Sequence, residues 1–196
     1  MKVEIGGGPI PLNGYVNVDH MDHPLVNHKV DLNKERLPFT DNSVDEIYSS
    51  HCLEHLSPGN GFIHCIEEMW RVSKPDAKWF LKVPYFNSHH TVANPFHTNN
   101  IFNEYTFHYF SAEHKEQDTT MVRKGSISET WILATLDVQK IEFGYFTNFK
   151  YLENMPEDIQ SNSRLKYPNV VNEIRYHIRV VKPDFWESER KRLGLI

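Results

Sequence analysis

Val3-Glu4-Ile5-Gly6-Gly7-Gly8 is an apolar run that breaks into three glycines, and Val16-Asn17-Val18-Asp19 follows it eight residues later. Glycine lacks Cβ, so it tolerates positive φ and lets a ligand approach the backbone closely. In an α/β sheet such a loop lies at the carboxyl end of its strand, where ligands bind. Asp19, which closes the second run, is then placed to accept hydrogen bonds from ribose hydroxyls. The two stretches therefore predict a pair of parallel strands that bind a nucleoside.

The residues around the glycines narrow the choice of ligand. Pro11 stands where a dinucleotide-binding fingerprint would have its third glycine. Pro9 and Pro11 also leave little room for a regular helix whose N-terminus could hold a pyrophosphate. No P-loop lysine follows the glycines, which disfavours a nucleoside triphosphate. Glu4 would repel an anion but suits a ligand that carries an ammonium group.

Length and composition set the broad class. The 196 residues, with 39% hydrophobic and 24% charged residues, indicate one globular domain spanning 1–196. A net charge of −5 makes nucleic acid an unlikely main partner. No apolar run approaches the roughly 20 residues of a membrane span. Cys52 and Cys65 lie in apolar surroundings and Met1 leads directly into a strand, so a reducing, cytoplasmic location is expected. The sequence is silent on oligomeric state.

Strand-like and helix-like segments alternate along the first half of the chain, which predicts a parallel sheet with right-handed crossovers. A further strand with one wet face is expected near the end, because apolar and polar residues alternate there. The expected strands after Asp19 are 29–33, 47–50, 78–84, 138–143 and 174–181, and a helix is expected from Ser57-Pro58 to about Ser73.

Aromatic and histidine residues are dense in the segment after the fifth expected strand, where periodicity fails. A long loop that follows a sheet strand is more often functional than accidental. Residues 85–130 are therefore predicted to form a lid or an acceptor-binding insertion. The aromatic side chains of this segment are expected to form the core of the lid.

Several motifs stand in one order and together resemble the class I S-adenosylmethionine-dependent methyltransferases, specifically their small type 11 branch. The resemblance is detailed from Val3 to Phe110 and generic over the strand pair in 138–183. It implies a Rossmann-like α/β fold with a seven-stranded, mostly parallel sheet, helices on both faces and an antiparallel last strand. The motifs are V-E-I-G-G-G at 3–8, G-Y-V-N-V-D at 14–19, D-L-N at 31–33, L-P-F at 37–39, D-N-S-V-D-E-I-Y-S-S-H-C-L-E-H-L at 41–56, E-E-M-W-R-V-S-K-P at 67–75 and V-P at 83–84.

The resemblance also implies a role for individual positions. The cofactor would be S-adenosylmethionine. The sequence does not reveal the methyl acceptor, but the negative charge disfavours nucleic acid, so we expect a small molecule such as a sugar or another metabolite. Glu4 would answer the ammonium group of the cofactor, and Gly6, Gly7 and Gly8 would line its methionine part. Asp19 would bind the ribose. Asp31 and Leu32 would flank the adenine, and Ser50 and His51 would border the methyl donor.

The chain departs from the pattern of this family in two places. Only seven residues separate Gly8 from Val16, which is too few for the usual crossover helix. We therefore expect a shortened first crossover and a more open cofactor pocket on that side. Asp76-Ala77 stands where the family commonly has a glycine pair after Lys-Pro, so the geometry of that turn is uncertain from sequence.

Histidines raise other hypotheses. His51-Cys52-Leu53-Glu54-His55 spells H-x-x-E-H, a zinc metalloprotease signature, which would need both histidines on one helix face. This segment follows a strand where the methyltransferase pattern expects it, so the protease is a remote alternative. The histidines between 89 and 114 match no standard zinc spacing, so no metal is predicted.

His97 is the predicted catalytic base, because imidazole titrates near neutrality and Asn94-Pro95-Phe96-His97 resembles a D-P-x-H element of this branch. Methyl transfer to a good nucleophile needs little from a base, since the sulfonium is a strong electrophile and alignment supplies much of the rate. A dedicated base is therefore not required. A methyltransferase-like module that binds the cofactor without turnover is the non-enzyme alternative.

Overall fold

The computed structural model describes residues 1–97, 100–111 and 134–182. Seven strands form one sheet in the order β3-β2-β1-β4-β5-β7-β6, and only β7 runs against its neighbours. This arrangement confirms the predicted Rossmann-like sheet with an antiparallel last strand. The strands are β1 (Lys2–Ile5), β2 (Val16–Asp19), β3 (His28–Lys29), β4 (Val44–Ser50), β5 (Ser73–Pro84), β6 (Thr135–Tyr145) and β7 (Val171–Val181).

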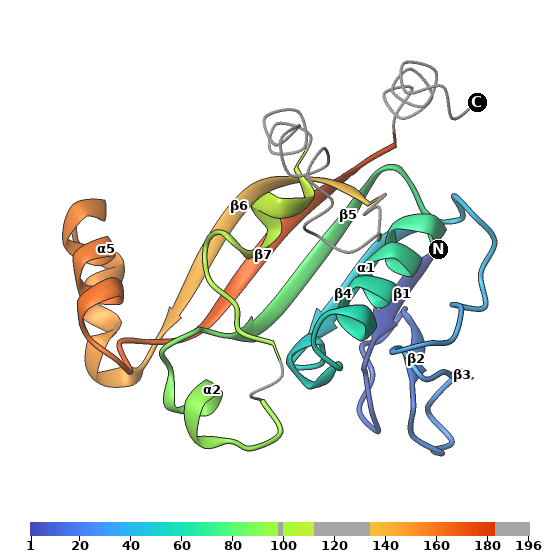
Figure 1. The fold of residues 1–196 in the computed structure, drawn as a ribbon, viewed down its shortest axis with the longest axis horizontal. Coiled ribbons are helices and arrows are strands. Elements are labelled where there is room, and N and C mark those ends of the chain that lie inside the picture. The colour runs from blue at the N-terminus through green and yellow to red at the C-terminus, as the bar shows by residue number, and fades with distance from the viewer. Residues whose placement is uncertain (98–99, 112–133, 183–196) are drawn as a thin grey trace, which may run out of the picture.

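Helices occupy the connections after β4 (Figure 1). The longest helix, α1 (Asn60–Val72), lies across the sheet near β4 and β1 and joins β4 to β5. Its buried Ile66, Met69 and Val72 belong to the same core as the apolar side chains of the strands. The other helices are α2 (His89–Ala93), α5 (Glu157–Lys166) and the 3-10 helices η1 (Leu53–His55), η2 (Thr106–Phe110) and η3 (Thr147–Asn154).

The first crossover is short, as predicted. Residues 6–15 join β1 to β2 without a helix, and residues 20–27 and 30–43 likewise join the next strands as loops. Parallel neighbours are normally joined by a crossover helix that covers one face of the sheet. In this protein three successive crossovers therefore contribute no helix to the packing of the sheet.

The two faces of the sheet differ as a result. Trp79, Leu81 and Val83 of β5 point into the core, and their β7 partners are the buried residues Ile178, Tyr176 and Ile174. Most of the alternate positions on β5 and β7 carry polar or charged side chains, with Phe80 as an apolar exception. Burying these charges would cost several kcal/mol each, so this part of the sheet has one apolar and one largely polar face. The polar face includes Lys78, Lys82, Lys140, Glu142, Arg175 and Arg179.

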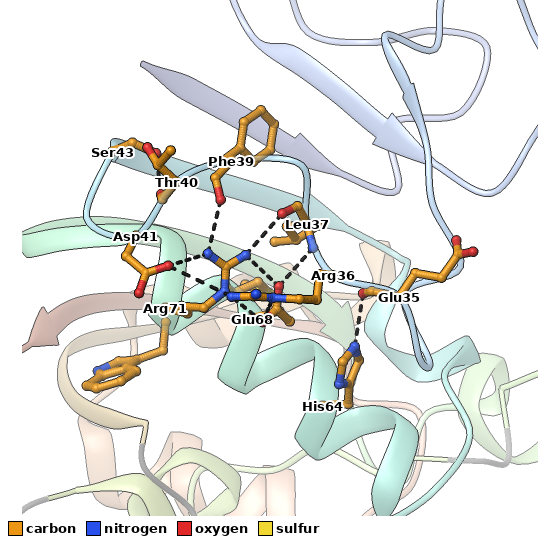
Figure 2. A network of polar contacts seen from close by, with 12 residues as sticks. Glu35, Arg36, Leu37, Phe39, Thr40, Asp41, Ser43, His64, Glu68 and Arg71 are labelled. Carbon is orange, nitrogen blue, oxygen red and sulfur yellow. Dashed lines mark hydrogen bonds and ion pairs between the residues drawn. The ribbon is translucent and has the colours of Figure 1, made fainter.

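Arg71 at the end of α1 fixes the loop between β3 and β4 (Figure 2). Its guanidinium donates to both carboxylate oxygens of Glu68 at 2.7 Å and to the carbonyls of Leu37 and Phe39 at 3.0 Å. It also donates to Asp41 at 2.6 Å. Glu68 in turn accepts the Leu37 N–H at 2.8 Å. A planar, bidentate cation thus holds in place a loop that has no secondary structure of its own.

Several predicted boundaries move. The third strand ends at Lys29, before the predicted 29–33, because the Asp31 side chain accepts the Asn33 N–H at 3.0 Å and turns the chain. Helix α1 begins at Asn60 and not at Ser57, after Gly59 with a φ of 71°. Asp76 adopts a φ of 61°, the left-handed conformation that explains a glycine at this place in the family.

The predicted lid is only partly described. Its residues 85–97 and 100–111 contain two short helices, α2 and η2, although no periodicity was found there. Residues 98–99 and 112–130 lie outside the described residues. The aromatic core forms only in part: Tyr85, Phe102, Phe107 and Phe110 are buried. Three other aromatic residues of the segment are exposed, namely Phe96, Tyr105 and Tyr109.

Candidate functional site

The glycine loop lies at the carboxyl end of β1, as predicted, and two of its glycines are left-handed. Gly6 has a φ of 74° and Gly8 a φ of 56°. The Gly6 N–H donates to the Val18 carbonyl at 2.8 Å, so the loop starts tied to β2. A Cβ on Gly6 would overlap the Sγ of Cys52, the residue that follows His51 after β4. Glycine is needed here both for the backbone conformation and for the close approach of a neighbouring strand end.

Asp19 joins this loop to the end of β2. One carboxylate oxygen accepts the Gly8 N–H at 2.9 Å, and the other accepts the Met21 N–H at 2.9 Å. The residue is only 6% exposed. An ionised carboxylate has about four lone-pair sites, so two such bonds leave capacity for the hydroxyls of a ribose.

Glu4 is buried beneath the same loop, at 5% exposure, and its carboxylate accepts the Leu12 N–H at 2.6 Å. Burial raises the pKa of Glu4, and the bond from Leu12 acts in the opposite sense. Asn17 lies beside it and donates to the Gly8 and Leu25 carbonyls at 2.9 Å. Sequence reasoning missed Asn17; its one signal is a polar residue between two valines of a central strand.

His51 follows β4 and is held by acids on both sides. Its φ is 51°, and its N–H donates to the Lys82 carbonyl at 2.9 Å. Its Nδ1 lies 3.3 Å from the Glu54 carboxylate, and its Nε2 lies 3.5 Å from that of Glu173. The ion pairs with Glu173 and then with Glu54 raise the pKa of His51 to about 9. His51 is therefore a cation at neutral pH, next to Ser50 at the predicted methyl-donor position.

Glu173 of β7 is a site residue that the sequence did not indicate. Burial acts to raise its pKa, but the bonds from His51, Lys82 and Arg175 outweigh burial and hold the pKa at about 2. The Lys82 ammonium lies 2.9 Å from its carboxylate. Lys82 and Glu173 come from β5 and β7, so only the pairing of these strands brings them to His51.

The two residues predicted to flank the adenine, Asp31 and Leu32, have different environments. Asp31 is half-exposed, and hydrogen bonds from Asn33 and Lys34 lower its pKa. Leu32 is 8% exposed and belongs to the hydrophobic core. Asp31 therefore offers a polar edge at the end of β3, while Leu32 anchors the same loop from below.

His51 and His55 do not form the helical pair that the metalloprotease hypothesis needs. His51 is left-handed and precedes the 3-10 helix η1, which ends at His55. The His55 ring lies beside that of His97, with centroids 4.6 Å apart. The tertiary structure thus gives His55 a partner in the lid, while His51 pairs with Glu54 and Glu173.

Comparison with known proteins identifies a family that part of the chain resembles. Residues 16–81 match the model of a family described as a methyltransferase domain, the type 11 family. The matched segment runs from β2 into β5 and contains Asp19, Asp31, Ser50 and His51. Over these residues the chain is similar to a type 11 methyltransferase domain. S-adenosylmethionine is the cofactor of this family. Among curated proteins, none is significantly similar to the chain.

Solved structures share the fold of the chain. A SAM-dependent methyltransferase from Archaeoglobus fulgidus is 14% identical, with 91% of this chain and 85% of that chain covered and a TM-score of 0.54. The [4+2]-cyclase SpnF is 13% identical, with 93% and 75% covered and a TM-score of 0.51. At these identities the likeness shows the fold alone. No helix in the described residues is long and apolar enough to cross a bilayer.

A cavity of about 440 Å³ lies beside the edge strand β6. Arg164 of α5 forms part of its wall and is 3% exposed; its guanidinium pairs with Glu157 at 2.6 Å and with Glu104 of the lid at 3.5 Å. Glu104 also accepts the Tyr85 hydroxyl at 2.8 Å. The cavity is thus a polar space between the lid, β6 and α5, with Phe143 and Tyr145 among its lining residues.

Proposed function

We propose that this protein transfers the methyl group of S-adenosylmethionine to a small-molecule acceptor. The observation that carries the proposal is the unit formed by the Gly6–Gly8 loop and Asp19 at the carboxyl edge of the sheet. In sheets of this kind ligands bind at that edge. The loop presents backbone without side chains, and Asp19 presents a carboxylate for ribose hydroxyls, which are the two features that this cofactor needs.

The methionine end of the cofactor would lie between the glycine loop and His51. Glu4 is the predicted partner of the ammonium group. It lies beneath the glycine loop and accepts the Leu12 N–H, which supports a role in fixing the conformation of that loop. The cation at His51 is held by Glu54 and Glu173. It would therefore favour the carboxylate of the cofactor's methionine part over its ammonium group.

The acceptor is proposed to bind beneath the lid. Residues 85–97 and 100–111 follow β5, whose carboxyl end lies at the same edge as the glycine loop. The polar cavity shares Glu104 with this segment. Its mixture of acids, Arg164 and the Tyr145 hydroxyl suits a polar metabolite with several hydroxyl or charged groups. His97, at the other end of the described lid, is the candidate base on the acceptor side.

The alternative is a protein of this fold that does not transfer a methyl group. The [4+2]-cyclase SpnF supports this alternative, because it shares the fold of this chain but is described as a cyclase. Methyl transfer must therefore be measured directly and separately from cofactor binding.

Two measurements test the proposal. Calorimetry with S-adenosylhomocysteine should show one binding site per chain with micromolar affinity. A screen of sugars and other hydroxylated metabolites should then show release of S-adenosylhomocysteine that depends on both acceptor and enzyme. A wild-type protein that binds neither form of the cofactor would refute the proposal, whereas binding without turnover across the screen would favour the non-catalytic module.

A further inference from the structure

Glu54 is a buried carboxylate that lacks hydrogen-bond donors. It belongs to η1 and is 1% exposed, and neither of its oxygens has a hydrogen-bond partner among the described residues. The one cation facing it is His51, whose Nδ1 lies 3.3 Å from Oε1 and whose other nitrogen is shared with Glu173. A buried carboxylate is unfavourable unless cations or donors surround it, so Oε2 in particular calls for a further positive group.

Two histidines stand beside this carboxylate. His55 is the next residue of η1, and His97 comes from the lid after α2. One ligand atom from each of Glu54, His55 and His97 can be chosen so that all three lie within 4.8 Å of one another. The two imidazole rings meet edge to face, at an angle of 75°. Two nitrogen donors and one oxygen donor thus converge on one small space.

The outer nitrogen of each ring already has a backbone partner. His97 Nδ1 lies 2.9 Å from the His90 carbonyl, and His55 Nδ1 lies 3.2 Å from the Phe96 carbonyl. A carbonyl can only accept, so in the neutral ring Nδ1 carries the proton and the lone pair is on Nε2. Metal-binding histidines are oriented in this way by outer partners.

We propose that Glu54, His55 and His97 bind a divalent first-row transition-metal ion. Two imidazoles and one carboxylate suit zinc or ferrous iron better than magnesium or calcium, which prefer all-oxygen sites. Donor atoms about 2.1 Å from a shared ion lie about 3.4 Å apart, so a shift of about 1 Å would close the site. Three protein ligands leave coordination positions for water or for an oxygen of a bound small molecule.

This site differs from both metal hypotheses that the sequence raised. His51 is not one of the ligands, so the H-x-x-E-H motif supplies only its last two residues. Of the lid histidines that the structure describes, only His97 belongs to this cluster. Sequence spacing predicted no metal because His55 and His97 are far apart in the chain, and only the contact of the lid with η1 joins them.

The test uses tag-free protein stripped with chelator and titrated with Zn²⁺ by calorimetry, and with Co²⁺ by visible absorption. We expect one ion per chain. Loss of an outer-sphere partner weakens metal binding by about 10- to 100-fold, so His55→Ala and His97→Ala should each weaken it by at least about 100-fold. Glu54→Gln keeps the shape of the side chain and removes its charge, and should weaken binding comparably.

His108→Ala is the matched control, because His108 is an exposed lid histidine outside the cluster. It should bind Zn²⁺ within about twofold of wild type. Thermal melts of each variant confirm folding, and the two histidine variants decide the question if Glu54→Gln does not fold. The proposal is overturned if wild type binds neither ion, or if His97→Ala binds as tightly as His108→Ala. Calorimetry with S-adenosylhomocysteine on the stripped protein separates this outcome from a failure of the proposed methyl transfer.

Discussion

The Gly8 N–H donates to the Asp19 carboxylate at 2.9 Å, so the loop after β1 and the acid that ends β2 form one unit. The position of each residue therefore depends on both strands. The bond fixes the left-handed Gly8 and holds the Asp19 carboxylate against the loop. It also means that one substitution will alter both the loop and the predicted ribose contact.

Asp19→Asn should weaken binding of S-adenosylhomocysteine. The amide keeps the size of the side chain but loses the charge that ribose hydroxyls and backbone N–H groups require. We expect a loss of about 1.5–3 kcal/mol, or roughly 10- to 150-fold in Kd, measured by calorimetry. Asp22→Asn is the control, because Asp22 is an exposed acid of the next loop. Equal affinities for the two variants would show that Asp19 does not contact the cofactor.

Gly6→Ala should destabilise the fold more than Gly14→Ala does. Both glycines have positive φ, so each substitution bears the left-handed cost of about 1–2 kcal/mol. A Cβ at Gly14 meets nothing within 4 Å, whereas one at Gly6 overlaps Cys52. The free energy of unfolding, measured in urea, should therefore fall by at least about 1 kcal/mol more for Gly6→Ala. A reversed order would mean that the end of β4 can move away from the loop.

Arg71→Ala should lower the free energy of unfolding by about 3 kcal/mol, because it leaves Glu68 and three backbone or side-chain acceptors without their donor. Arg71→Lys should recover only part of this loss, since an ammonium cannot bond Glu68 in a bidentate fashion. Arg36→Ala is the control: Arg36 is mostly exposed and lies 3.7 Å from Glu68, so its loss should cost below about 1 kcal/mol. Urea unfolding of the three variants ranks these contributions.

Glu173→Gln should lower stability at neutral pH and should do so less in acid. The pKa of Glu173 is about 2 in the folded protein, against 4.5 for an ordinary glutamate, because the ion pairs with His51, Lys82 and Arg175 outweigh burial. The stabilisation is therefore complete above about pH 4.5 and is lost as pH falls toward 2.

Melting temperatures of wild type and Glu173→Gln should accordingly differ most at pH 7, by the equivalent of up to about 3 kcal/mol, and converge between pH 4.5 and 2. Glu153→Gln changes an exposed glutamate and should track wild type throughout. A difference that stays constant with pH would show that Glu173 acts through packing and not through its charge.

His97→Ala should depress turnover while leaving the affinity for S-adenosylhomocysteine within about twofold. His97 contacts the His90 carbonyl and the His55 ring. A loss of about 100-fold or more is expected for a direct role in proton transfer, measured on metal-free protein because an imidazole nitrogen that binds a metal cannot accept a proton. Steady-state rates at saturating cofactor and acceptor make the measurement, with His108→Ala as the reference. Unchanged turnover would place His97 outside the reaction.

The sequence by itself determined the succession of strands along the chain and the edge of the sheet at which the predicted cofactor residues lie. Glycines after an apolar run, an acid at the end of the next strand and period-two alternation in 174–181 are local signals, and local backbone preferences are enough to express them. The short first crossover followed from counting residues. Element boundaries differed from the prediction where a side-chain hydrogen bond ends an element, as that of Asp31 does after β3.

Only the tertiary structure decided which distant side chains meet. Glu173 reaches His51 because β7 pairs with β5 next to β4, and Arg71 binds a loop some thirty residues earlier because α1 packs beside it. The polar face of the sheet depends on strand register. Alternation within one strand does not say which residues of the neighbouring strands lie beside it. His97 meets His55 through the path of the lid. Such contacts depend on where the chain returns in space, and the residues that make them carry no shared spacing in the sequence.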